Sequence, residues 1–317
     1  MNAGARRLAL FMVLLVSVGL LGEGHSAQAK SAVLYPAPPT SVSRYRADLN
    51  AGAKLNQLTA AQVAQLAKVT NKNELYTTGC HSPSTAPGAN PIDCVFANPE
   101  ASKSMWLIGD SHAAMWFPAV KAFALSRGLK LVVYTKSSCP ILSGLPANSQ
   151  TDEPYTACID YNDWILERLT AAKLAGASPN LVLVVGYQGI QRLTVFQSGI
   201  GLSRLSGLAE HIVALQDSPK QHGPLPVCLK NHSHQIKRCA VSPAMGYYGV
   251  VTRELANTAR DNGFTFVEAR SWFCTNTTCP PVIAGRIMYA DVTHITTDAA
   301  IYLSNRLKFA LDSALNR

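Results

Sequence analysis

The chain has 317 residues, with 28 Lys and Arg against 19 Asp and Glu, and a formal net charge of +9. Hydrophobic residues make up 48% and charged residues 15%, against roughly a quarter charged in an average domain, so the composition favours a folded core over a disordered chain. It excludes a collagen and a coiled coil, and the lack of repeated long apolar runs excludes a polytopic membrane protein. The length fits one large α/β domain or two smaller domains.

The N-terminal segment has the pattern of a secretory signal peptide. Arg6 and Arg7 precede an apolar run over residues 8–21, and residues 27–29, Ala-Gln-Ala, place small side chains at the spacing that a signal peptidase requires. We therefore predict cleavage after Ala29 and an extracytoplasmic, secreted protein. An uncleaved N-terminal anchor stays open as an alternative, because the run is near the length boundary for a membrane span.

If the protein is exported, its eight cysteines are expected to form disulfides, because paired thiols persist as disulfides in oxidising compartments. They form four couples of near neighbours separated by turn-rich sequence, which makes sequential pairing the economical prediction. A metal site is the alternative for one region, where Cys228, His232, His234 and Cys239 lie close in sequence, although they lack a tight zinc knuckle. The predicted disulfides, with no metal, are Cys80–Cys94, Cys139–Cys158, Cys228–Cys239 and Cys274–Cys279.

The mature chain divides into a leader over residues 30–75 and an α/β domain over residues 76–317. Residues 30–43 are polar and rich in proline, which predicts an extended segment. Apolar spacing over 55–69, with Thr59 placed to begin a helix, predicts one short helix in the leader. Residues 76–99 are rich in Pro, Gly, Ser and Asn around two cysteines, which predicts a stapled loop.

From residue 105 onward, predicted strands alternate with predicted helices. Leu181-Val182-Leu183-Val184-Val185 has no polar alternation, the pattern of a strand covered by helices on both faces. We therefore predict a three-layer α/β/α sandwich with a mostly parallel, flavodoxin-like sheet, in which ligands meet the carboxyl ends of the strands. The predicted strands are 105–108, 129–134, 181–185, 212–215 and 264–267, and the predicted helices are 113–126, 158–173, 247–262 and 297–315.

Chemistry-bearing residues follow the first of these strands. In Gly109-Asp110-Ser111-His112, glycine permits a sharp turn and serine stands where a helix begins. Free N–H groups and the positive end of the helix dipole at that point stabilise an oxyanion on a bound acyl carbon. Two roles for Ser111 are open, nucleophile and helix cap. For His112 we favour a packing role over contact with substrate.

A second polar group precedes the C-terminal helix. A serine hydroxyl needs an imidazole within hydrogen-bonding reach, and the other ring nitrogen of that imidazole needs a carboxylate or carbonyl partner. Asp291 and His294 are three residues apart in a predicted turn, so one can orient the other. Each is common in turns, but the order Ser111, Asp291, His294 makes the set more informative than its members.

These motifs resemble the SGNH (GDSL-type) hydrolase superfamily. Residues 108–113, Ile-Gly-Asp-Ser-His-Ala, followed by Met-Trp, resemble the family's nucleophile block, and Tyr289-Ala-Asp-Val-Thr-His294 resembles its closing block. The Ser-Ser-Cys-Pro run at 137–140 and the later cysteine couples are similar to the extracytoplasmic SGNH domain fused to bacterial membrane acyltransferases that O-acetylate O-antigen and peptidoglycan. The resemblance covers about residues 75–317.

The resemblance implies that Ser111 is the nucleophile, His294 the general base and acid, and Asp291 the residue that orients His294. It also implies an oxyanion hole made by the serine N–H, a glycine after the second strand and an asparagine after the third. This chain has neither the glycine nor the asparagine there. Backbone N–H groups at Ser137 or Ser138 and the amide of Gln188 are the substitutes that we consider, and a slow enzyme is one expectation, because loss of a donor costs about 10²–10³ in rate.

Together these features predict a secreted carbohydrate O-acetylesterase or O-acetyltransferase that works through an acyl-serine and needs no cofactor. Its expected partners are an acylated glycan or cell-wall polysaccharide and a membrane acyltransferase, and we expect a monomer. A catalytically silent module that binds envelope polysaccharide or an acyltransferase is the alternative. Nucleic-acid binding is not expected, because the basic residues are scattered and no recognition motif accompanies them.

Overall fold

A computed structural model describes residues 35–86, 88, 94–141, 155–187, 201–247 and 249–316. Tyr35–Arg317 forms one unit, which is described below. The predicted signal peptide, residues 1–29, lies outside the described residues. Among the described residues, no helix is both long enough and apolar enough to cross a membrane.

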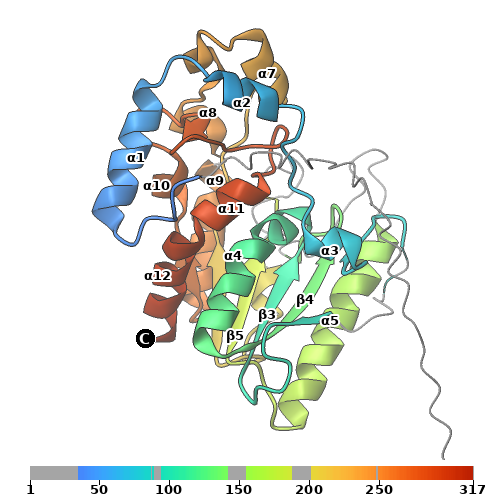
Figure 1. The fold of residues 1–317 in the computed structure, drawn as a ribbon. Coiled ribbons are helices and arrows are strands. Elements are labelled where there is room, and N and C mark those ends of the chain that lie inside the picture. The colour runs from blue at the N-terminus through green and yellow to red at the C-terminus, as the bar shows by residue number, and fades with distance from the viewer. Residues whose placement is uncertain are drawn as a thin grey trace, which may run out of the picture. The chain divides into compact units, whose positions relative to one another are not determined.

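The central sheet is mostly parallel and follows the doubly wound pattern (Figure 1). Its strand order is β1-β4-β3-β5-β6-β7, with every neighbouring pair in that order parallel. Counting only the five predicted strands, the order is second, first, third, fourth, fifth, so the switch point lies between β3 and β5. The predicted fold class is therefore confirmed. The five strands are β3 (Ser104–Gly109), β4 (Lys130–Lys136), β5 (Leu181–Val185), β6 (His211–Leu215) and β7 (Thr265–Val267).

Two short strands that the sequence did not predict lie on the outer edge of β4. β1 (His81–Ser82) pairs in parallel with the end of β4, and β2 (Val95–Phe96) pairs antiparallel with its beginning. Both fall inside the predicted stapled loop, and the Cys80–Cys94 disulfide joins their flanks. Strands of two residues carry no readable periodicity, so only the disulfide signal was visible in the sequence.

Alternate residues of the strands build two separate apolar cores. Leu107 and Leu183 face α4 (Ser111–Arg127), α11 (Thr297–Tyr302) and α12 (Ser304–Leu315) on one side. Ile108 and Val184 face α5 (Thr156–Leu174) and α9 (Gly249–Asp261) on the other. This double coverage explains why β5 is apolar at all five positions.

The N-terminal leader is more helical than predicted. A helix, α1 (Val42–Lys54), begins inside the segment that we predicted to be extended, with Ser41 as its N-cap, and it buries Tyr45 and Leu49. The predicted 55–69 helix is shortened to α2 (Ala60–Gln65), because Leu55 ends α1 and the capping box begins at Thr59. A third helix, α3 (Glu74–Thr77), leads into β1.

The C-terminal half departs from the prediction in its small elements. The single helix predicted over 297–315 is divided at Leu303, which ends α11 and begins α12. Several short elements were not predicted, because one or two turns of helix or two residues of strand leave little pattern. They are α7 (Leu225–Asn231), η1 (Ile236–Cys239), α8 (Pro243–Gly246), α10 (Arg270–Phe273), β8 (Val282–Ile283) and β9 (Arg286–Ile287).

All eight cysteines are joined in the sequential couples. The bonds are Cys80–Cys94, Cys139–Cys158, Cys228–Cys239 and Cys274–Cys279. The second ties the loop after β4 to the first turn of α5, and closing a loop of that size contributes about 3 kcal/mol in the chain-entropy model. In the region where a metal site was the alternative, the two sulfur atoms are bonded to each other.

Candidate active site

The turn after β3 presents Ser111 at the carboxyl edge of the sheet. Gly109 has φ of +147°, and a Cβ there would lie 1.7 Å from the Val185 carbonyl oxygen of β5. Asp110 then caps α4, accepting the His112 N–H with one carboxylate oxygen and the Tyr187 N–H with the other. The buried Asp110 carboxylate thus fixes the start of α4 to the end of β5, and Ser111 is the first residue of the helix.

The three residues predicted as a triad meet in one hydrogen-bonded chain. Ser111 Oγ lies 2.8 Å from His294 Nε2, and His294 Nδ1 lies 2.8 Å from Asp291 Oδ2. The second carboxylate oxygen of Asp291 accepts the backbone N–H groups of Thr293 and His294, each at 2.8 Å. This Asx turn fixes the Asp291 carboxylate beside the His294 ring. The hydrogen bond between Ser111 and His294 joins residues that are 183 positions apart in sequence.

Electrostatics sets the proton positions in this chain. Burial alone would raise the pKa of Asp291, but the hydrogen bonds from the His294 ring and backbone and from the Thr293 N–H outweigh it and lower the pKa to about 2. The carboxylate is therefore ionised at neutral pH, and the His294 Nδ1–H must donate to it. In the neutral form of the imidazole, Nε2 then accepts a hydrogen bond from the Ser111 hydroxyl, the arrangement that activates a serine.

The loop after β4 supplies a glycine-like conformation without a glycine. Ser138 has φ of 56°, in the left-handed region that glycine favours. The neighbouring Ser137 N–H donates to the Ser82 carbonyl at 2.9 Å. Of the two serine N–H groups predicted as oxyanion donors, only that of Ser138 therefore has no acceptor among the described residues. The Ser111 N–H, at the first helical position, has no intrahelical acceptor either. Gln188, the third predicted donor, lies outside the described residues.

Comparison with known proteins bears on this site. A family model described as "SGNH domain (fused to AT3 domains)" matches residues 79–309, which is most of the chain. The chain belongs to this SGNH family. The structure of a Salmonella ser. Paratyphi A lipopolysaccharide acetyltransferase periplasmic domain is similar in fold, with a TM-score of 0.52 and 15% identity over 67% of this chain and 84% of that chain. A comparison with curated proteins gives no match.

A second histidine–aspartate pair, which the sequence did not reveal, packs beside the first in this SGNH domain. His112 Nδ1 lies 2.7 Å from Asp217 Oδ1, and both side chains are buried. Burial alone would lower the pKa of His112, but the Asp217 carboxylate outweighs it and raises the pKa. The His112 ring lies 4.6 Å from the His294 ring, centroid to centroid. Asp217 follows β6. A polar residue just after a strand is the pattern that indicated Ser111, and the same pattern would have indicated Asp217.

A third histidine of the SGNH domain lies at the edge of the site. His81 on β1 is hydrogen-bonded to Thr135 Oγ1 at 3.0 Å and to Ser137 Oγ at 2.9 Å. Burial, and then the charges of Lys72 and other cations, lower the pKa of His81 to about 4. His81 is therefore neutral at pH 7 and fixes the loop that carries Ser138.

We predict that Ser138→Gly is well tolerated, because glycine adopts the left-handed conformation freely. The free energy of unfolding should change by less than about 1 kcal/mol, since relief of strain offsets the greater entropy of the unfolded chain. Ser138→Val, a β-branched residue in the same conformation, should cost about 1–2 kcal/mol. Urea unfolding of the three proteins makes the comparison, and equal stability of the glycine and valine variants would contradict the assigned backbone conformation.

We predict that His81 lowers the free energy of unfolding of the protein as the pH falls. Unfolded histidine titrates near pH 6.5, whereas His81 in the fold titrates near 4. Between these values the unfolded state binds a proton that the native state does not, so up to about 3 kcal/mol of stability is lost as the pH falls from 6.5 to 4. Unfolding free energies measured across this range should show a smaller loss in His81→Gln, with His234→Gln, an exposed histidine, as the matched control. Parallel curves for wild type and His81→Gln would refute the prediction.

Proposed function

We propose that this protein is a serine enzyme that moves acyl groups, acetyl first among them, to or from hydroxyls of extracytoplasmic carbohydrate. The observation that carries the proposal is the hydrogen-bonded chain from Ser111 Oγ through His294 to the ionised Asp291. Membership of the SGNH family supports acyl chemistry, and the fold shared with a lipopolysaccharide acetyltransferase periplasmic domain supports a glycan outside the cytoplasm. The signal-peptide pattern of residues 1–29 supports the same location.

The first half of the proposed reaction acylates Ser111. His294 Nε2 takes the hydroxyl proton as Ser111 Oγ attacks the ester carbonyl, and the His294 imidazolium is stabilised by Asp291. Negative charge on the carbonyl oxygen is met by the N–H groups at the start of α4, with the Ser138 N–H as the proposed second donor. The tetrahedral intermediate then breaks its bond to the alcohol oxygen, which takes the proton from His294.

The second half returns the enzyme to its starting state. His294, neutral again, removes a proton from water or from a sugar hydroxyl, whose oxygen attacks the acyl-serine carbonyl. The Ser111 ester bond breaks, and Ser111 Oγ recovers the proton from His294. Water yields an esterase and a sugar hydroxyl yields a transferase, with the same residues in both. The family's fusion to AT3 domains supports a membrane acyltransferase as the proposed partner that supplies acyl groups.

The experiment that tests this function offers both acceptors at once. The protein is incubated with 4-nitrophenyl acetate and a panel of tetrasaccharides, and mass spectrometry separates released acetate from acetylated sugar. We expect one or both products from the wild-type protein and neither above background from Ser111→Ala. Equal product from the two proteins would overturn the proposal.

A silent glycan-binding module is the second candidate, and a specific observation favours it. The Tyr187 N–H, two residues after β5, already donates to Asp110 Oδ2 and is therefore not available as an oxyanion donor. Glycan binding without turnover of 4-nitrophenyl acetate by wild-type protein would decide for the module.

A further inference from the structure

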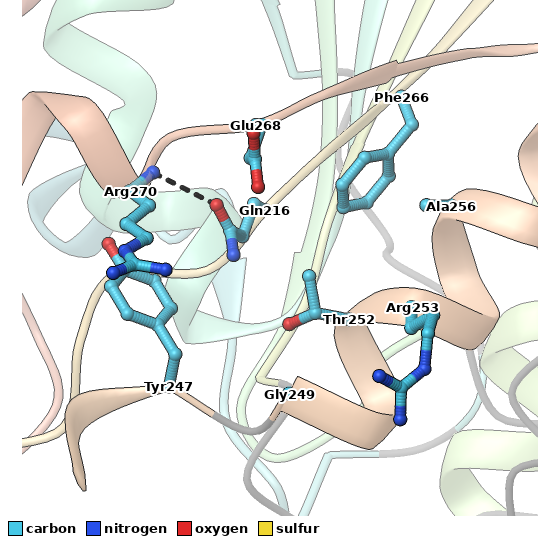
Figure 2. Close-up of a pocket in the computed structure, with 9 residues that line it drawn as sticks. All are labelled: Gln216, Tyr247, Gly249, Thr252, Arg253, Ala256, Phe266, Glu268 and Arg270. Carbon is cyan, nitrogen blue, oxygen red and sulfur yellow. Dashed lines mark hydrogen bonds between the residues drawn. The ribbon is translucent and has the colours of Figure 1, made fainter. Parts of the chain in front are cut away.

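A cavity of about 520 Å³ lies beside α9 (Figure 2). Gln216 directly follows β6 and Glu268 directly follows β7, so the cavity is at the same carboxyl edge of the sheet as Ser111. Neither Ser111 nor His294 lines it. Its volume is within the usual range for small-molecule sites, and the triad chemistry does not use it.

The cavity contains a polar group that is fixed before any ligand arrives. Gln216 is buried, and its side-chain oxygen accepts the N–H groups of Ala269 at 2.8 Å and Arg270 at 2.9 Å. These bonds define which end of the carboxamide is oxygen. The amide nitrogen therefore faces the other way, and Figure 2 shows it directed into the space between Tyr247, Thr252 and Glu268.

The remaining lining matches a hydroxyl-rich ring better than an apolar ligand. Glu268 supplies an acceptor, Arg270 supplies donors, and the Thr252 hydroxyl can do either. The Phe266 and Tyr247 rings supply flat apolar surface for the C–H face of such a ring. The charged residues of the lining are Arg253, Arg270 and Glu268. This charge is compatible with a neutral sugar or a sugar with one acidic group.

The cavity and the nucleophile share one scaffold. Asp217, the neighbour of Gln216 in the chain, is hydrogen-bonded to His112. His112 in turn follows Ser111 and packs on the His294 ring. Strand β6 is two strands from β3, a separation of about 10 Å at the usual strand spacing. A short oligosaccharide is longer than this separation of the two strands.

We propose that this cavity is a carbohydrate subsite, which holds one sugar ring of a glycan while Ser111 acts on an ester carried by another ring of the same chain. This inference rests on the proposed function for its second half, whereas sugar binding in the cavity is testable without catalysis.

Two variants probe the cavity. Gln216→Glu keeps an oxygen for the two backbone N–H groups but replaces the amide donor, and Glu268→Gln removes an exposed carboxylate. Glu167→Gln is the matched control, because Glu167 lines a different cavity, beside α5. For each protein we compare kcat/KM on partially O-acetylated tetrasaccharides of glucose, galactose, N-acetylglucosamine and rhamnose with kcat/KM on 4-nitrophenyl acetate.

We expect the ratio of the two kcat/KM values to fall at least tenfold in both cavity variants, through KM for the tetrasaccharide, and to stay at the wild-type value in Glu167→Gln. A ratio unchanged in the cavity variants would overturn the subsite.

Binding is measured separately, by saturation-transfer NMR of the unacetylated tetrasaccharides with Ser111→Ala protein. Signal lost when Gln216→Glu is added supports the subsite even if no ester is turned over, a result that would overturn only the proposed function. No signal from any tetrasaccharide, or signal unchanged by Gln216→Glu, overturns the subsite.

Discussion

Ser111→Ala is expected to lower kcat on a small acetyl ester by about 10⁴-fold or more, which is the scale of loss when a nucleophile is removed from a triad. The physical reason is that Ser111 Oγ is the atom within 2.8 Å of the His294 base and at the start of α4, so its loss removes both the acyl-serine and the use of the oxyanion donors. The measurement is steady-state turnover of 4-nitrophenyl acetate.

Related variants separate a triad from an adventitious reaction. His294→Ala should cost about as much as Ser111→Ala, and the double variant should cost no more than either, because residues that act as a unit are not additive. Ser126→Ala, on the last turns of the same helix, is the matched control and should keep the wild-type kcat. Losses in Ser111→Ala and His294→Ala that multiply in the double variant would count against a shared mechanism.

Gly109→Ala is expected to destabilise the fold by about 3 kcal/mol or more, the second large effect. The added Cβ would meet the Val185 carbonyl oxygen of β5 at 1.7 Å, and φ of +147° is strained for any other residue. Since β5 is a central strand, relief requires β3 and β5 to separate, which would also move Ser111 away from His294.

The matched control is another glycine of the same helix–strand unit. Gly128 ends α4 with φ of +65°, and a Cβ there meets nothing within 4 Å. Gly128→Ala should therefore cost only about 1 kcal/mol, from backbone strain alone. Denaturant unfolding of both variants gives the comparison, and equal costs would show that the contact with Val185 is not the cause.

The sheet and the contact of Ser111, Asp291 and His294 could be predicted from the sequence for related reasons. Buried parallel strands such as 181–185 leave continuous apolar runs, and polar residues directly behind such runs lie at one edge of the sheet. That reasoning placed Ser111 at the edge, and the short spacing of Asp291 and His294 indicated their contact. The sequential cysteine couples were readable because neighbours in a loop are near in space.

Other features depend on contacts or conformations that leave no local signal. Helix α1 buries few side chains, Tyr45 and Leu49 among them, so its apolar stripe is too sparse to predict. The pairing of His112 with Asp217 joins residues 105 positions apart. The left-handed conformation of Ser138 could not be predicted from the sequence, because serine, unlike glycine, has no preference for it.

The central claim is that Ser111 is a nucleophile activated by His294, and labelling tests it most directly. The protein is treated with a fluorophosphonate, digested, and the adduct is located by mass spectrometry, with His294→Ala treated in parallel. We predict a single adduct on Ser111 that forms far more slowly in His294→Ala. No adduct, an adduct on a different serine, or equal labelling of the two proteins would contradict the claim.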